Sequence, residues 1–249
     1  MTNLLRLRRL GVAFLIVAGV ALLLAACGGS GSDKDSSDPG ASASASAPAS
    51  GTSVAEVINT SCGAGYYCGA LLQDPLPRPD MTLTDTKGQP FNIAKDTQGE
   101  LTLVYMGYTH CPDICPTFMA QLGAVMKNLP PDIRDKIKVV FVTTDPARDT
   151  GPVLRNWLDS FDEDFIGLTG TDEQIAEISP MLGMPAPTKE DLGNGNYAVS
   201  HGSLIYAFDK NDNDTRIVYP EGFPNEDLRN DFIKLVTNGF QADKADAKG

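Results

Sequence analysis

The sequence predicts an α/β domain, and three observations support this prediction. Short apolar and β-branched runs of strand length alternate with longer amphipathic segments of helix length. Gly, Pro, Asp and Asn separate these runs, as expected for turns. The stretch from residue 70 to residue 240 has the length of a single domain. Strands that alternate with helices indicate a sheet whose faces are covered by helices.

The predicted elements follow one another along this stretch. They are a hairpin-like lead-in at 81–93, a buried strand at 101–105, a helix at 117–129, a strand at 137–142, a helix that begins at 150–152, a strand at 165–169, a helix at 172–182, strands at 204–208 and 216–219, and a last helix at 225–240. Pro130 and Pro131 end the first helix. Strand-helix-strand units, a closing hairpin and a final helix together give a thioredoxin-like α/β sandwich.

Two cysteines lie between the strand at 101–105 and the helix that follows it. Three residues separate Cys111 from Cys115, so on a helix both would occupy one face. Because proline prefers the first helical position, Pro116 favours a helix that begins near Cys115, with Cys111 on the preceding loop. Thiolates are soft ligands for Cu(I), zinc or iron-sulfur centres, and a helix N-terminus lowers the pKa of a thiol. In either arrangement the two sulfurs can converge on one ion.

The chain contains two histidines that could complete such a site. His110 adjoins Cys111, and adjacent side chains often point in different directions. His201 precedes the strand at 204–208, and in a thioredoxin-like fold the residue leading into that strand abuts the start of the cysteine-bearing helix. We therefore expect His201 to complete a Cys2His set, with His110 as the alternative ligand.

The same residues resemble a known family. Residues 107–116 read GYTHCPDICP, residues 144–150 read TDPARDT, and Ser200 and His201 follow downstream. Over roughly residues 76–240 the chain is similar to the SCO/SenC family, copper chaperones of cytochrome c oxidase assembly. The resemblance implies that Cys111, Cys115 and His201 bind copper, as Cu(I) or Cu(II).

The resemblance also implies a partner, the dinuclear copper centre of cytochrome c oxidase subunit II, together with other copper chaperones or thiol-disulfide exchange proteins. A second function class fits the same two thiols. In a thiol-disulfide oxidoreductase, one of Cys111 and Cys115 attacks a partner disulfide and the other resolves the mixed disulfide. His201 distinguishes the two classes, because a copper carrier needs a third ligand and a dithiol reductase does not.

Asp145 follows the strand at 137–142, at the edge of the sheet where functional residues often gather. One interpretation is a carboxylate that orients His201 or a partner from behind the metal ligands. The other is a turn aspartate, with Arg148 and Asp149 as local ion-pair or capping groups. The sequence favours neither.

The N-terminus predicts export and membrane attachment. Three arginines precede an apolar stretch at 10–24, which is short for a membrane span and suits a signal peptide. Residues 24–27 read LAAC and resemble a bacterial lipobox. We expect a lipoprotein signal peptide at 1–26, lipidation of Cys27, and attachment to the extracytoplasmic face of the cell membrane. An uncleaved single-pass anchor is the alternative, and it gives the same topology.

Residues 27–69 are expected to form a lipid-anchored linker, rich in Gly, Ser, Ala, Asp and Pro. Its first part, of about 26 residues, has a random-coil reach of roughly 25–30 Å. Near its end, Cys62 and Cys68 suit a structural disulfide in an oxidising compartment, with accessory copper binding or thiol exchange as alternatives. The domain itself is expected at 70–240, and residues 241–249 form a polar tail.

The charge of the chain is strongly negative. Twenty basic and 32 acidic residues give a net charge of −12. Cleavage after residue 26 would remove three arginines and no acidic residue, which leaves the protein more acidic still. Such a protein is repelled by nucleic acid and by anionic lipid headgroups. The composition therefore excludes nucleic acid as a partner, and membrane attachment must come from the lipid or the leader.

Overall fold

A computed structural model describes residues 57–58 and 66–241. Contacts divide the chain into two units, residues 1–49 and 50–249, and all described residues belong to the second. The expected signal peptide, Cys27, Cys62, most of the linker and residues 242–249 of the tail lie outside the described residues. Among the residues that are described, no helix combines the length and the apolar character needed to cross a membrane.

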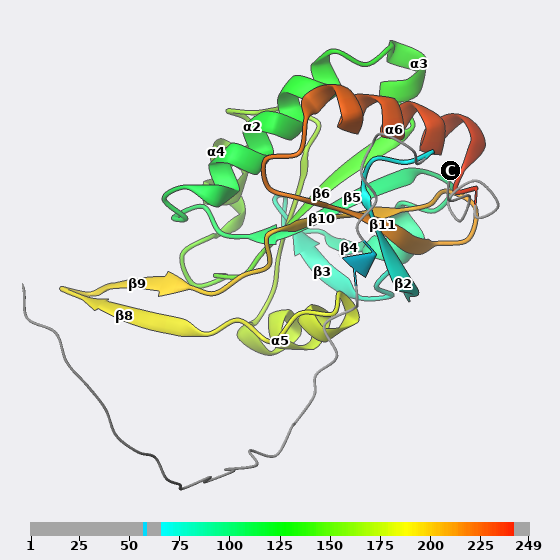
Figure 1. Ribbon diagram of the computed structural model, residues 1–249. Helices are drawn as coiled ribbons and strands as arrows, with labels where there is room; N and C mark the ends of the chain where they lie inside the picture. The colour runs from blue at the N-terminus through cyan, green and yellow to red at the C-terminus, as the bar shows by residue number, and fades with distance from the viewer. Residues whose placement is uncertain (1–56, 59–65, 242–249) are drawn as a thin grey trace, which may run out of the picture. The chain divides into compact units, whose positions relative to one another are not determined.

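The predicted thioredoxin-like α/β sandwich is confirmed (Figure 1). In chain order the elements are β1 (Val57–Ile58), β2 (Ala70–Pro77), β3 (Thr82–Asp85), β4 (Pro90–Asn92), α1 (Ile93–Asp96), β5 (Leu101–Gly107), α2 (Ile114–Lys127), α3 (Pro131–Arg134), β6 (Ile137–Thr143), α4 (Gly151–Leu158), β7 (Ile166–Thr169), α5 (Asp172–Met181), β8 (Lys189–Gly193), β9 (Asn196–Val199), β10 (Leu204–Phe208), β11 (Asp214–Pro220) and α6 (Asn225–Asn238).

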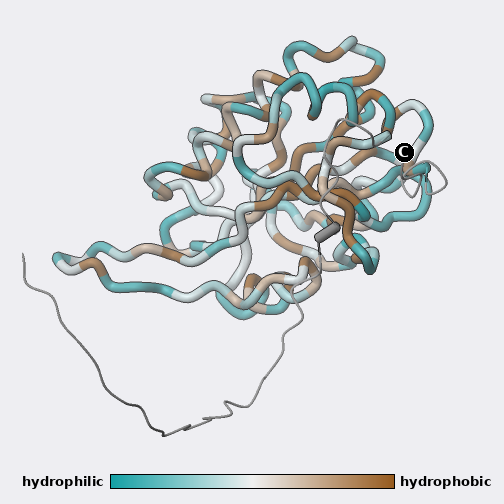
Figure 2. Tube along the Cα trace, viewed as in Figure 1, coloured by the Kyte–Doolittle hydropathy of each residue, from teal (hydrophilic) through white to brown (hydrophobic). Residues whose placement is uncertain are grey.

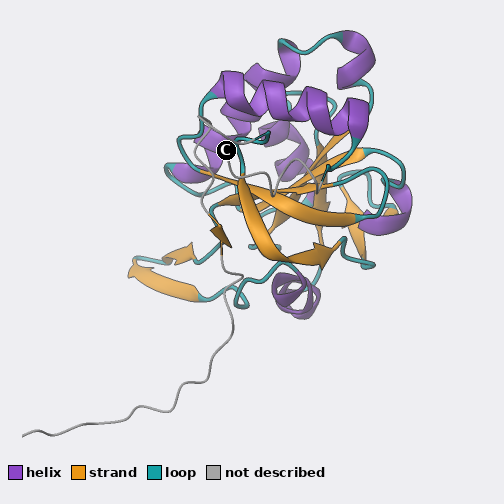
Figure 3. Ribbon diagram, turned by 45° about the vertical axis from the view of Figure 1, so that its right-hand side comes forward, coloured by secondary structure: helices purple, strands orange, loops and turns teal. Residues whose placement is uncertain are grey.

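One nine-stranded sheet forms the centre of the described unit, in the order β1-β2-β11-β10-β5-β6-β7-β3-β4. Strands β5, β6 and β7 are parallel, whereas β10 pairs antiparallel with β5. Helices α2, α3, α4 and α6 pack on one face and α5 packs on the other (Figure 3). The carboxyl ends of β5 and β6 therefore lie side by side, and the loops that follow them can share one site.

The core explains why β5 and β6 occupy the middle of the sheet. All seven residues of β5 are buried, and its side chains alternate between the two hydrophobic clusters on opposite faces. These central strands are among the most hydrophobic parts of the trace (Figure 2). A strand that is buried on both faces has a continuous apolar sequence, and for this reason β5 could be predicted from the sequence.

Several elements differ from the sequence-based expectation. Helix α2 begins at Ile114 rather than at residue 117, so Pro116 lies within its first turn, where proline is tolerated. Cys111 therefore lies on the loop, as a helix starting near Cys115 requires. Strand β2, the short helices α1 and α3, and the hairpin β8–β9 were not predicted. The hairpin forms a separate two-stranded sheet and leads directly to His201 (Figure 1).

The cysteines of the described unit differ in their bonding. Cys111 and Cys115 are free thiols. Cys68 is disulfide-bonded, and its partner lies outside the described residues. The predicted pairing of Cys68 with Cys62 lies outside the described residues and stays a prediction.

Candidate metal centre

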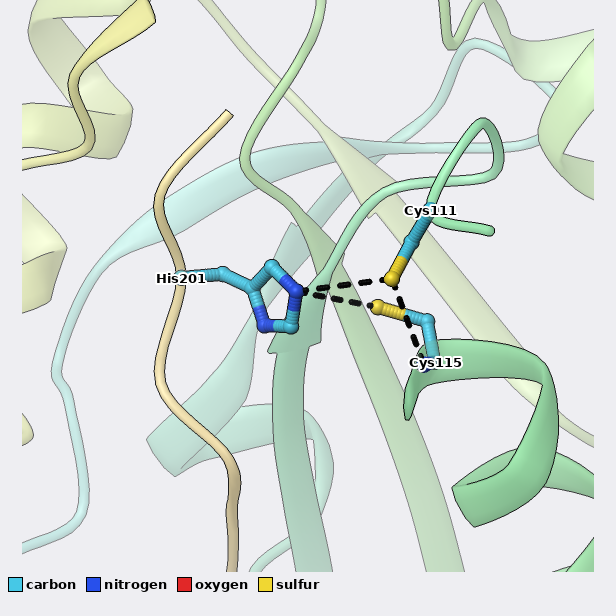
Figure 4. Close-up of side chains that lie close together, drawn as sticks. All are labelled: Cys111, Cys115 and His201. Atoms are coloured by element: carbon cyan, nitrogen blue, oxygen red, sulfur yellow. Dashed lines mark hydrogen bonds between the residues drawn. The ribbon is translucent and has the colours of Figure 1, made fainter. Parts of the chain in front are cut away.

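Two sulfurs and one imidazole converge at the carboxyl end of β5. The Sγ atom of Cys111 lies 3.5 Å from Nε2 of His201, and the Sγ atom of Cys115 lies 3.6 Å from the same nitrogen (Figure 4). All three atoms lie within 4.8 Å of one another. This is the one group of three or more cysteine, histidine or acidic residues with metal-binding geometry among the described residues.

These distances suit ligands of a single ion. For zinc, metal–sulfur and metal–nitrogen bonds are about 2.3 and 2.0 Å long, and a tetrahedral angle between them separates the two ligand atoms by roughly 3.6 Å. The separations of 3.5 and 3.6 Å match this value. Two thiolates and an imidazole form a soft donor set that suits copper.

The position of Cys115 depends on Gly107 at the end of β5. A Cβ atom at residue 107 would lie 2.6 Å from Sγ of Cys115 and 2.8 Å from the ring of Tyr105, both far inside van der Waals contact. The missing side chain therefore makes room for the sulfur. Tyr105 also contacts this sulfur, because its Oη donates a hydrogen bond to Sγ of Cys115 at 3.6 Å.

The loop that carries Cys111 is fixed by a buried carboxylate. Asp149 is fully buried and accepts hydrogen bonds from the backbone amide of Thr109 at 2.9 Å and from its hydroxyl at 2.6 Å. The same carboxylate accepts a hydrogen bond from the hydroxyl of Thr143, at the end of β6. The loop after β5 is thus joined to the adjacent strand, two residues before Cys111.

Burial sets the protonation of Cys115. The residue has no exposed surface, and desolvation raises the pKa of its thiol to about 12, against the opposing effect of the Tyr105 hydroxyl. The expectation that the helix N-terminus lowers the pKa is therefore wrong for Cys115, because loss of hydration outweighs the helix dipole. In the absence of metal this sulfur carries a proton at neutral pH.

His201 presents one defined nitrogen to the sulfurs. Its Nδ1 lies 2.8 Å from the carbonyl oxygen of Gly202, which can only accept, so Nδ1 carries the proton of the neutral ring. Nε2 then has a free lone pair directed at the two sulfurs, which is the tautomer that a metal ligand requires. The ring also packs edge-on against Tyr108, with centroids 5.5 Å apart.

His110 lies elsewhere. Its exposed ring contacts the hydroxyl of Thr109 at 3.0 Å and lies 3.7 Å from the carboxylate of Asp149. It is not part of the convergent group. The alternative in which His110 supplies the third ligand is therefore not supported by the geometry.

A match to a family model covers residues 72–237, which is well over half of the chain, and the model is described as SCO1/SenC. The chain belongs to the SCO1/SenC family.

Two curated relatives of this SCO1/SenC chain have SCO2 in their names. The SCO2-like protein of Rickettsia felis is 36% identical over 158 residues, which cover 62% of this chain and 74% of the relative. The mitochondrial SCO2 protein of Saccharomyces cerevisiae is 36% identical over 128 residues, which cover 51% of this chain and 42% of the relative. A relative from Stutzerimonas stutzeri, at 39% identity, is covered over 65% of its length.

Solved structures support the fold and the choice of metal. The ScoI protein of Bradyrhizobium japonicum with copper bound is 30% identical, with a TM-score of 0.55 over 65% of this chain and 98% of that one. Apo Sco1 of Thermus thermophilus is 26% identical, with a TM-score of 0.60 over 70% of this chain and 99% of that one. Copper is bound in the Bradyrhizobium structure, and this chain has a Cys-Cys-His group whose geometry could hold a metal ion.

Asp145 is fully buried in this SCO1/SenC protein and is not part of the group of metal ligands. It accepts a hydrogen bond from Oη of Tyr197 at 2.8 Å and a close one from Nε of Arg148. The local ion pair considered from the sequence is thus present. No hydrogen bond joins Asp145 to His201 in the described part of the chain, so any influence on the imidazole is indirect, through Tyr197 or Arg148.

Sequence reasoning did not identify Tyr105, Arg148 or Tyr197 as contributors to the site. The signal for Tyr105 is its place in the strand, two residues before Gly107, where alternation directs it to the same face as Cys115. Arg148 belongs to the TDPARDT segment and was considered only as a partner of Asp145. Tyr197 carried no such signal, because the hairpin that contains it was not predicted.

Proposed function

We propose that this protein is a copper carrier that binds one copper ion through Cys111, Cys115 and His201. The observation that supports the proposal most directly is the convergence of two free sulfurs on Nε2 of His201, at 3.5 and 3.6 Å. Cys111 and Cys115 are two members of a large hydrophobic cluster made mostly of apolar side chains, and His201 reaches them from the segment before β10. The ion is therefore a cargo that the fold can lose, rather than a structural element.

We further propose that the acceptor is the dinuclear copper centre of cytochrome c oxidase subunit II, as the family resemblance implies. Other copper chaperones or thiol-disulfide exchange proteins are further partners under this proposal. A lipid on Cys27 would hold the protein at the extracytoplasmic face of the cell membrane. The linker would then let the domain reach roughly 25–30 Å from that face.

The test of the site is an anaerobic copper titration of the purified, reduced protein. We expect one copper ion per chain, and no stoichiometric binding in the Cys111→Ser, Cys115→Ser double variant. His201→Ala should weaken Cu(II), which suits nitrogen donors, far more than Cu(I), which two thiolates can hold. His110→Ala is the matched control, since this exposed histidine lies beside the same loop but outside the group. Equal effects of the two histidine substitutions would refute the assignment of His201.

The test of delivery is oxidase assembly in cells that produce the variants. Loss of the subunit II copper centre with His201→Ala, and normal assembly with His110→Ala, would support the carrier function. Normal assembly with His201→Ala, together with unchanged binding of both copper states, would exclude His201 as a ligand.

The anchor is tested separately. Mass spectrometry of the mature N-terminus should detect a lipidated Cys27, whereas an intact leader on the mature protein would refute the lipobox. Cys27→Ser should leave the copper site unchanged.

A second candidate function, a thiol-disulfide oxidoreductase, is favoured by the two free thiols within 4.8 Å of each other. In that reaction Cys111 would be the attacking residue, because Cys115 is fully buried and its thiol stays protonated. Reductase activity that survives His201→Ala while copper delivery is lost would make the dithiol reaction a secondary activity of the same pair.

A further inference from the structure

The third ligand is held differently from the two sulfurs. Cys111 and Cys115 belong to a loop and a helix that are attached directly to the central sheet. His201 instead follows the hairpin β8–β9, which forms a sheet of its own (Figure 1). All five residues of β8 are exposed. The position of His201 therefore depends on what fixes the hairpin to the body of the domain, together with β10, which begins at Leu204 and pairs with β5.

The largest set of such contacts surrounds Arg148. The guanidinium carbon of Arg148 lies 3.7 Å from the ring centroid of Tyr197 in β9 and 5.6 Å from that of Tyr108, on the cysteine loop. We call these three residues the arginine stack. Tyr108 in turn packs against the ring of His201. The stack thus contacts both the hairpin that leads to His201 and the loop that leads to Cys111.

A buried carboxylate fixes the orientation of the stack. Asp145 accepts a hydrogen bond from Nε of Arg148 with one oxygen and from Oη of Tyr197 with the other. Nη2 of Arg148 is buried and has no hydrogen-bond partner in the described part of the chain. Asp145 therefore bonds to both partners, and the face of the guanidinium is left for the ring of Tyr197. Planar stacking of this kind is specific to arginine and is not reproduced by lysine.

The hairpin has other contacts with the domain, since Val199 at the end of β9 packs in the main hydrophobic cluster. Ser200 bonds to Thr188 through backbone and side chain, which closes the hairpin on itself. Lys189 and Asp172 form an exposed pair at 3.2 Å, and such pairs contribute little. Arg148 thus contacts both the hairpin and the cysteine loop, which are also joined by a hydrogen bond between Tyr108 and the backbone of Val199.

We propose that the arginine stack positions His201 over the two cysteines, and that it thereby sets the preference of the site for Cu(II) over Cu(I). Arg148 and Tyr197 are positioning residues and do not contact the ion. Cu(II) needs the imidazole nitrogen, whereas Cu(I) can be held by two thiolates alone. Loosening the hairpin therefore lowers affinity for Cu(II) selectively. This inference rests on the copper site proposed above.

The test compares copper affinities of Arg148→Met and Tyr197→Leu with those of the unmodified protein. Loss of residues that orient metal ligands typically lowers affinity by about ten- to hundred-fold, and we expect a loss of this size for Cu(II). Cu(I) affinity should change much less. Tyr197→Leu leaves the pair of Asp145 and Arg148 in place, so it decides the question if Arg148→Met does not fold.

A matched control is Arg216→Met. Arg216 also lies over an aromatic ring, that of Phe240 at 5.3 Å, and pairs with Asp212 and Asp214. Arg216 lies near the start of β11, away from the copper site. The end of β11 near the site is residue 220, which pairs with Leu204, close to His201. Arg216→Met should leave both copper affinities unchanged. A fall in Cu(II) affinity equal to that of Arg148→Met would refute the specific role of the stack.

A readout on the metal-free protein separates positioning from direct ligation. The backbone amide of Ser200 donates to the carbonyl of Thr188 at 2.9 Å, next to His201. Hydrogen exchange at this amide should become faster in Arg148→Met and Tyr197→Leu, without faster exchange in α6. Unchanged exchange at Ser200 in both variants would overturn the inference.

A double-mutant cycle completes the test. If Arg148 acts through His201, then adding Arg148→Met to His201→Ala causes no further loss of Cu(II) affinity. Full additivity would overturn the inference, as would equal losses of Cu(I) and Cu(II) affinity in Arg148→Met. The proposed copper site fails on a different result, namely unchanged Cu(II) affinity in His201→Ala alone. A strong effect of His201→Ala with none from Arg148→Met or Tyr197→Leu refutes only the role of the stack.

Discussion

Copper binding by this protein should release the proton of Cys115. Burial raises the pKa of this thiol from an ordinary value of 9.0 to about 12. Since one pKa unit corresponds to roughly 1.4 kcal/mol, burial disfavours the thiolate by about 4 kcal/mol in the absence of metal. At pH 8 the thiol is therefore almost fully protonated. A metal ion must displace that proton, because only the thiolate is a ligand.

The assay is a pH-stat titration of the reduced protein with Cu(I) under anaerobic conditions at pH 10, where a thiol with the ordinary pKa of 9.0 is mostly ionised and Cys115 is still protonated. The unmodified protein should release at least one proton per bound ion, and Cys115→Ser should release about one fewer, since each displaced thiol proton is counted once. The apparent affinity of the unmodified protein should correspondingly rise with pH. Equal proton release by the two proteins would mean that Cys115 is already ionised, and would refute the argument from burial.

The same pKa shift predicts how the stability of the metal-free protein depends on pH. The folded-state pKa is raised above the unfolded value, so between pH 9 and about 12 the unfolded chain binds fewer protons than the native state. The contribution of Cys115 is therefore fully present below pH 9 and is lost as the pH rises towards 12. Denaturant unfolding at pH 8 and pH 10 should show a loss of stability that Cys115→Ser reduces. An equal loss in both proteins would assign the effect to other groups.

Three further predictions concern the scaffold. Gly107→Ala adds a methyl group 2.6 Å from Sγ of Cys115, and we expect weaker copper binding and a loss of about 1–3 kcal/mol in the free energy of unfolding, measured with denaturant. Asp231→Ala removes the buried acceptor of the Cys68 and Gly69 amides, at 2.7 and 2.9 Å, and should cost at least about 2 kcal/mol in the same assay. Chelation of copper should leave cooperative unfolding intact and lower only the melting temperature. The stabilisation that is lost is about 2.7 kcal/mol of unfolding free energy when free metal is 100-fold above Kd. Loss of cooperativity in calorimetry would instead indicate a structural metal.

Much of the fold could be predicted from sequence because its signals are local. The strand at β5 is a continuous apolar run, and the proline pair after α2 marks the end of that helix. The placement of Cys111 on a loop and of Cys115 in the first helical turn follows from the preference of Pro116 for the start of a helix. His201 was located by its position before β10, which the family resemblance reinforced.

What could not be predicted depends on contacts between distant segments. Strand β8 is exposed over all five residues and has no apolar alternation, so no periodic signal marks it. Its place is set partly by Tyr197 and Arg148, which are far apart in sequence. The pKa of Cys115 was predicted in the wrong direction for a similar reason. The helix dipole is visible in the sequence, whereas desolvation arises from the tertiary surroundings of the sulfur.

The way in which the three ligands are held bears on how a carrier could release its ion. The two sulfurs are buried and belong to segments that pack in the main hydrophobic cluster, so moving them would disturb the core. His201 is only half-buried and follows a hairpin whose first strand is exposed over its whole length. The imidazole is therefore the ligand that can leave at the lowest cost in free energy. Under the proposed function, an acceptor would replace the imidazole first and the two thiolates last. His201→Ala should then slow the loading of Cu(II) more than the transfer of Cu(I), which stopped-flow measurement with a copper acceptor can test; equal effects on both steps would contradict this order.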